Sequence, residues 1–218
     1  MGDLINFIQD PGNAFAEHTI AYLQICAVSI LFAIIIGVVL GVAVSRSAIL
    51  SFIAVNLSGL MRAIPVIAFL IAALPYLGVG FKPTVVALIV LGIPPILLNT
   101  YTGIRGIDPS IIDAARGMGM TQWQIISRIQ TPLVLPIIAA GIRTASVQIV
   151  ATATLAAIIG AGGYGEYIID GLNRLNNVAI LAGAIPVAIL AIAVELFMSW
   201  LQRALTPQGL RAQAQTNS

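Results

Sequence analysis

Long runs of apolar residues, separated by short polar stretches, dominate the sequence. A membrane-crossing helix needs about 20 mostly apolar residues, with some excess length for tilt. Five runs are long enough, and the spans are expected at about residues 19–44, 50–77, 83–103, 134–160 and 178–204. The runs are continuous rather than alternating, which excludes the strands of a β-barrel. The pattern therefore predicts an all-α, polytopic transmembrane protein with about five spans.

The polar ends of the chain divide it into three regions. Residues 1–18 carry acids but no Lys or Arg, unlike a cleavable signal peptide, and are expected to form an extracytoplasmic tail. Residues 19–204 form the transmembrane domain, including cytoplasmic helices at about 108–131. Residues 205–218 are polar and rich in Gln and Ala, which predicts a disordered cytoplasmic tail.

The basic residues fix the expected orientation, because cytoplasmic loops of membrane proteins are enriched in Lys and Arg. With the N-terminus outside and five spans, six basic residues lie in inner segments: Arg46, Arg105, Arg116, Arg128, Arg203 and Arg211. Only Lys82 and Arg174 lie in outer segments. The chain is therefore expected to be N-out and C-in.

Composition narrows the function classes. The chain is 59% apolar and 8% charged, with a mean hydropathy of +1.03, which excludes a soluble enzyme. Cys26 and His18 are each the sole residue of their type, so neither an intrachain disulfide nor a two-histidine metal site can form. In a soluble protein the excess of basic residues would suggest a nucleic-acid partner. In a membrane protein the placement of these residues in the loops matters more than their total, so no nucleic-acid partner is expected.

The longest inner segment predicts a short amphipathic helix. Asp108 followed by Pro109 is a helix start, with an oxygen-bearing cap and proline at the first helical position. Apolar residues then recur on one face, and Gly117 and Gly119 are expected to end the helix. That face consists of Ile111, Ala114, Ala115 and Met118.

A second helix is expected to follow. Thr121 and Gln124 have the spacing of a capping box, and Trp123, Ile126 and Ile129 would form its apolar side. Pro132 and Pro136 mark the entry to the fourth span. The segment is thus predicted to be a helix–turn–helix at the cytoplasmic surface.

This segment resembles the "EAA" loop of ABC importer permeases. The loop has Glu-Ala-Ala, three residues, Gly, nine residues and Ile-x-Leu-Pro. Here the sequence is Asp113-Ala-Ala-Arg-Gly-Met-Gly119 and, nine residues later, Ile129-Gln-Thr-Pro132. The spacing matches throughout, while Asp113 replaces Glu and Thr131 replaces Leu.

Other stretches are similar to the osmoprotectant branch of these permeases, which imports glycine betaine, carnitine, choline and related quaternary amines. They lie at residues 92–105, 141–145 and 152–163, and the similarity covers about 55–175. Permeases of methionine or other amino-acid ABC importers are the alternative within the class.

The resemblance implies the type I importer permease (MetI-like) fold in a bacterial plasma (inner) membrane. It implies a second permease copy, identical or paired, an extracytoplasmic substrate-binding protein and two ATPase subunits. ATP and Mg would bind the ATPase, since this chain lacks a phosphate-binding loop and is expected not to be an enzyme. In the family, the helix around the motif seats in the ATPase, which assigns coupling to Asp113, Ala114, Ala115, Arg116, Gly117, Met118, Gly119, Ile129 and Pro132.

Polar and helix-breaking residues within the spans are candidates for a translocation pathway or gate. Charge and proline at membrane depth are tolerated beside protein or a water-filled cavity. The candidates are Arg62, Pro65, Pro94, Pro95, Asn99, Thr144, Thr152 and Thr154. Arg62 could equally be structural, Arg143 could snorkel inward, and Glu195 could pair with a span arginine or lie at the inner interface.

Three further features have mainly structural interpretations. Gly37 and Gly41 form a small-xxx-small pair suited to helix packing. Tyr164 and Tyr167, with Tyr76 and Phe81, are expected to be anchors at the outer membrane interface. His18 is expected to have no specific role.

Two other classes compete with the importer. An intramembrane protease would need a serine–histidine dyad, for which only His18 is available. An autonomous channel or secondary transporter would need more spans or inverted repeats than the sequence shows.

Overall fold

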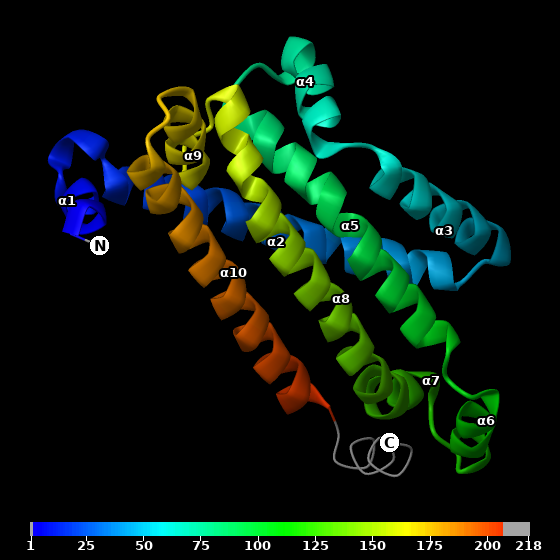
Figure 1. Ribbon diagram of the computed structural model, residues 1–218. Helices are drawn as coiled ribbons and strands as arrows, with labels where there is room; N and C mark the ends of the chain where they lie inside the picture. Colours follow the sequence, from blue (N-terminus) through cyan, green and yellow to red (C-terminus); the bar gives the residue numbers. More distant parts are fainter. Residues whose placement is uncertain (1, 207–218) are drawn as a thin grey trace.

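Of the 218 residues, the computed structural model describes residues 2–206, with side chains from residue 4. All regular elements in this range are helical (Figure 1). They are α1 (Gly2–Gln9), η1 (Pro11–Asn13), α2 (Phe15–Ser45), α3 (Ala48–Ala63), α4 (Val66–Leu77), α5 (Phe81–Arg105), α6 (Pro109–Gly117), α7 (Gln122–Ile125), the π-helical η2 (Ile126–Gln130), α8 (Thr131–Thr152), the 3-10 helix η3 (Ala153–Ile159), α9 (Tyr164–Asn173) and α10 (Asn177–Leu205). The expected disordered tail, residues 205–218, lies outside the described residues from 207 onward.

Four helical stretches within the described range are long and apolar enough to cross a membrane: Pro11–Ser45, Phe81–Arg105, Gln122–Ile159 and Asn177–Leu205. They coincide with four of the five expected spans. The first begins earlier than residue 19, because α2 starts at Phe15 and the preceding residues are themselves helical. Within residues 2–18, Gly2–Gln9 and Pro11–Asn13 are helical, and α2 begins at Phe15.

The second expected span, at 50–77, is not a continuous helix. It consists of α3 and α4, which meet at an angle of 93°. Proline has no backbone N–H and disfavours helical geometry in the residue before it. Ile64, which precedes Pro65, accordingly has an extended backbone (φ −77°, ψ 120°). Among the described residues there is a fifth candidate span only if this bent pair is counted as one.

Helix α5 lies at the centre of the bundle, between α2 and α8 (Figure 1), and α10 packs on α8. The α2–α5 contact uses the predicted glycine pair. A Cβ atom on Gly37 would lie 2.8 Å from Cβ of Ile96, and one on Gly41 would lie 2.5 Å from Cβ of Thr100. The small-xxx-small prediction is confirmed as packing within this chain.

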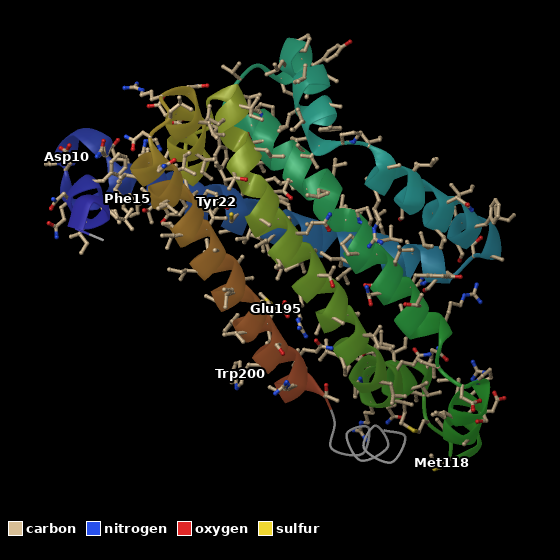
Figure 2. All side chains as sticks on the ribbon, viewed as in Figure 1. Asp10, Phe15, Tyr22, Met118, Glu195 and Trp200 are labelled. Atoms are coloured by element: carbon tan, nitrogen blue, oxygen red, sulfur yellow. The ribbon has the colours of Figure 1, made fainter. Side chains whose placement is uncertain are left out.

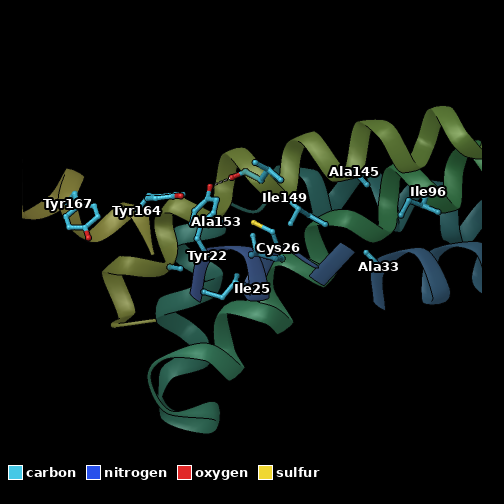
Figure 3. Packing of buried hydrophobic residues seen from close by; sticks show 13 residues of the cluster. Tyr22, Ile25, Cys26, Ala33, Ile96, Ala145, Ile149, Ala153, Tyr164 and Tyr167 are labelled. Carbon is cyan, nitrogen blue, oxygen red and sulfur yellow. Dashed lines mark hydrogen bonds between the residues drawn. The ribbon is translucent and has the colours of Figure 1, made fainter. Parts of the chain in front are cut away.

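The main core lies mostly between the N-terminal half of α2 and the C-terminal half of α8 (Figure 3). Tyr22 is fully buried, and its hydroxyl donates to the backbone carbonyl of Val150. This bond satisfies the polar end of a large side chain that is otherwise surrounded by apolar groups. The core thereby joins α2 to α8 across 128 positions of the sequence.

Candidate functional site

The predicted helix start at Asp108 is confirmed. The Asp108 Oδ1 atom accepts a hydrogen bond of 2.9 Å from the backbone N–H of Ser110, and Pro109 occupies the first turn. This bond holds the pKa of the Asp108 carboxyl below its ordinary value, because it stabilises the ionised form. Helix α6 therefore begins with a charged cap at neutral pH.

The end of α6 uses one of the two predicted glycines. Gly119 has φ +80°, the left-handed conformation that glycine adopts at little cost. Gly117 instead remains within the last helical turn. The prediction was right for Gly119 and wrong for Gly117, whose backbone needs no special freedom.

The capping box of the next helix is also confirmed. The Thr121 hydroxyl accepts from the N–H of Gln124 at 3.4 Å, and the Thr121 N–H donates to Gln124 Oε1 at 2.8 Å. The second helix is longer than its apolar side alone predicts. Helix α7 continues through η2 directly into α8, so Pro132 lies within one helical stretch that also includes the fourth span.

The surface of this helix pair is open at the end of the bundle (Figure 2). Of the predicted apolar face of α6, only Ala115 is buried, while Ile111, Ala114 and Met118 are exposed. Met118 and, on α7, Trp123 are 73% and 75% exposed. Arg116 lies 3.6 Å from Asp113 on the same exposed helix, a pair that contributes little to stability. Large exposed apolar side chains on a capped helix are typical of a protein-binding surface.

The pathway candidates do not gather into one cluster. Arg62 and Pro65 lie exposed at the α3–α4 break. Pro94 and Pro95 are buried within α5, which continues unbroken to Arg105, so the expectation that they break the helix is wrong. Asn99, one turn later, donates from Nδ2 to the carbonyl of Pro95 at 2.8 Å.

The candidate threonines bind their own helix where bonds are seen. The Thr144 hydroxyl donates to the Ala140 carbonyl at 3.0 Å, and the Thr154 hydroxyl donates to the Ala151 carbonyl at 3.1 Å. Thr152 is half-buried at the end of α8. These bonds satisfy the hydroxyl protons locally and leave acceptor lone pairs.

A charged pair joins α8 to α10. The Arg143 Nε atom donates to Glu195 Oε1 at 2.8 Å, and Arg143 Nη2 donates to the same oxygen. Of the interpretations left open for these residues, the structure supports their pairing. Gln202, whose Oε1 lies 3.4 Å from Arg143 Nη1, is an additional member that the sequence did not indicate. Spacing along the chain could not show it, because Arg143 and Gln202 are 59 residues apart.

At the end of the bundle that includes α9, two predictions from the sequence were wrong. Tyr164 and Tyr167 are only 6% and 7% exposed, so they are core residues rather than interface anchors. The Tyr167 hydroxyl donates to the Asn13 carbonyl at 2.5 Å, and burial raises the Tyr167 pKa to about 12. His18 is not without partners, since its Nδ1 lies 3.6 Å from Glu166 and its ring lies against Tyr167.

The described residues thus form apolar helices that can span a membrane, a partly exposed charged pair between α8 and α10, and an exposed helix pair at one end. Residues 33–208 match the family described as binding-protein-dependent transport system inner membrane components, and the chain belongs to this family. It is therefore an inner-membrane transport component rather than an enzyme, and the family description makes its transport dependent on a binding protein.

Relatives match over almost the whole chain. The carnitine transport permease protein OpuCB of Listeria monocytogenes is 38% identical over 97% of both chains. The glycine betaine/carnitine/choline transport system permease protein OpuCB of Bacillus subtilis is also 38% identical over 97% of both. The osmoprotectant import permease protein OsmW of Salmonella typhimurium is 35% identical, covering 96% of this chain and 100% of its own.

A solved structure shows the same fold. The inward-facing MetNI methionine ABC transporter has a chain that superposes with a TM-score of 0.75 at 22% identity. The match covers 88% of this chain and 96% of that one. The MetI-like fold expected from the sequence is confirmed.

Proposed function

We propose that this chain is the permease subunit of an ATP-driven importer of osmoprotectants such as glycine betaine, carnitine or choline. The supporting observation is the similarity, over almost the full chain, to three permeases at 35–38% identity, two named for carnitine or for glycine betaine, carnitine and choline and one named for osmoprotectants. The alternative is a methionine importer, but the likeness to a methionine transporter is one of fold at 22% identity. A shared fold at this identity does not indicate a shared substrate.

The exposed helix α6 is the proposed contact with the ATPase. Asp108 caps α6 and Thr121 caps the adjoining α7, which makes the pair short and rigid. Met118 at the end of α6 and Trp123 on α7 give the pair an apolar surface for a partner. In this role the segment from Asp113 to Gly119 contacts the ATPase, and Ile129 and Pro132 lie on the helical stretch that follows. Because η2 and α8 continue from α7 without a break, a displacement of α6 and α7 would be transmitted to α8.

The proposed assembly contains two permease chains, two ATPase subunits and an extracytoplasmic binding protein. The ATPase subunits bind ATP and Mg. The charge distribution supports an N-out, C-in orientation, which places α6 and α7 in the cytoplasm and α9 outside. Alternating access would then follow from closure of the ATPase pair against both α6 helices.

Uptake by proteoliposomes tests the substrate class. The complete transporter, with its encoded partners and internal ATP, should import radiolabelled glycine betaine, carnitine or choline. Methionine supplied at the same concentration should not enter. Import of methionine alone, or uptake driven by an ion gradient without ATP, would contradict the proposal.

The variant Asp113→Lys tests coupling. It should lower uptake about tenfold or more, because it reverses a charge at the proposed ATPase contact while leaving the exposed helix folded. Membrane insertion should be unchanged. The matched control is Asp170→Lys, since Asp170 is also an exposed acid paired with an arginine on its own helix, but on α9. Normal uptake by the Asp113 variant would remove α6 from the coupling role.

A further inference from the structure

The Arg143–Glu195 pair lies deep within the spanning helices. Arg143 is 12 residues beyond the start of α8 at Thr131, and Glu195 is 10 residues before the end of α10 at Leu205. At 1.5 Å per residue these positions are about 18 Å and 15 Å from the same end of the bundle. Figure 2 shows Glu195 on α10 beside α8. Both charges therefore lie at membrane depth.

The pair borders an open cavity lined by both polar and apolar side chains. The cavity has a volume of about 490 Å³, within the range of small-ligand sites. Thr144 and Gln148 line it from α8, and Gln202 lines it from α10. Ala140 and Gln202 also line a second cavity of about 610 Å³, which reaches Asp108 and Ile111 at the cytoplasmic helices.

The face of α8 and α10 that carries the ion pair is poorly suited to contact with lipid. The Arg143 and Glu195 side chains are 35% and 37% exposed, and contact of a charge with hydrocarbon is strongly unfavourable. Elsewhere α10 exposes Ile189, Ile192 and Leu196, which suit lipid. The polar face of α8 and α10 must therefore meet water or protein, as the wall of a pathway would.

The geometry of the ion pair allows each partner to pair with a charged group of a solute instead. Both Arg143 contacts go to one oxygen, Glu195 Oε1, so the pair lacks the two-oxygen fork of the strongest arginine–carboxylate pairs. A molecule carrying both a carboxylate and an ammonium group can replace each partner with its own opposite charge. A simple cation can satisfy Glu195 alone and would leave Arg143 without a counter-charge at membrane depth.

We propose that Arg143 and Glu195, with Thr144, Gln148 and Gln202, form a binding site for zwitterionic solutes within the membrane. The carboxylate of the solute pairs with Arg143 and its ammonium group with Glu195. The site is neutral overall, so it favours zwitterions such as glycine betaine and carnitine over the cation choline. This inference rests on the proposed function for its substrate class.

A cysteine-protection assay tests the site without transport or binding protein. The permease–ATPase complex in nanodiscs carries Val147→Cys, which lines the cavity, in a Cys26→Ala background. A water-soluble methanethiosulfonate reagent should label this cysteine. It should not label the matched control Ile189→Cys, whose side chain is 63% exposed on the apolar face of α10. Absence of labelling at position 147 would overturn the aqueous site.

Ligand protection then tests the charge pair. Excess glycine betaine should slow labelling at position 147, and choline should slow it about tenfold less, the difference expected of one hydrogen-bonded charge. Adding Arg143→Gln should abolish the difference, whereas Arg174→Gln, which removes the exposed pair with Asp170, should preserve it. Equal protection by both solutes, or none by either, would overturn the proposal.

A second variant separates ligand binding from a structural role. Arg143→Gln with Glu195→Gln replaces the ion pair by two neutral amides that can bond each other. A purely structural pair predicts that labelling and protection remain as in the parent protein, which would overturn the site. The proposed site predicts continued labelling with loss of protection by glycine betaine. Failure of osmoprotectant uptake with intact zwitterion protection would reject the proposed function alone.

Discussion

At the residue scale, the absence of one side chain determines how closely α2 and α5 approach. Gly41 faces Thr100, which is fully buried and whose hydroxyl donates to the carbonyl of Ile96 in its own helix. There is no room between them for a methyl group. The sequence indicated a close contact at this glycine pair, but the partner helix became evident only from the three-dimensional arrangement.

Gly41→Ala should destabilise the folded protein by about 1–3 kcal/mol, because the added Cβ would overlap Thr100. Thermal unfolding in detergent measures the loss. The matched control is Gly59→Ala in the middle of α3, where an added Cβ meets no atom within 4 Å. That control should be neutral or stabilising by up to about 1 kcal/mol, through helix propensity alone. Equal losses in both variants would argue against the close contact.

At the scale of single elements, Asp108 determines how firmly α6 begins. Its pKa is lowered in the folded state, so its contribution to stability is present above the ordinary carboxyl pKa and is lost as pH falls through the lowered value. Asp108→Ala should speed amide hydrogen exchange in the first turn of α6 at neutral pH. The variant Asp108→Asn, which keeps an acceptor, should have a smaller effect.

The pH dependence offers an internal check on that cap. Protection of the first turn, corrected for intrinsic exchange rates, should fall in the parent protein as the solution is acidified below the ordinary carboxyl range. In Asp108→Asn it should not change. Identical pH profiles for the two proteins would mean that the carboxylate charge does not stabilise α6.

The elements that sequence predicted well are those fixed by nearby residues. Caps such as Asp108 and the Thr121–Gln124 box act over two or three positions, and span lengths follow from local hydropathy. The misjudged features depend on distant contacts. Tyr167 and His18 were misread because their partners lie about 150 positions away. Proline was ambiguous for the same reason: Pro65 breaks a helix, whereas Pro94 and Pro95 sit within the packed α5.

At the scale of the whole molecule, cysteine labelling can measure the orientation of the chain across the membrane. In a Cys26→Ala background, Asp10→Cys should react with an impermeant thiol reagent applied to intact spheroplasts, because Asp10 lies before the first span. Trp123→Cys, which is exposed on α7, should react only after permeabilisation. The reverse pattern would refute the N-out, C-in arrangement and the cytoplasmic position of α6.

The bend between α3 and α4 affects how the protein can survive in a bilayer. The last turn of a helix leaves carbonyl oxygens without partners in that helix, and Pro65 has no N–H. The break borders a cavity shared with Ala87 and Leu91 of α5, which lie about 9 and 15 Å along that helix from Phe81. Exposed backbone at that depth cannot be solvated by hydrocarbon. We therefore expect a single chain to be poorly accommodated in hydrocarbon at this bend unless water or other protein covers it.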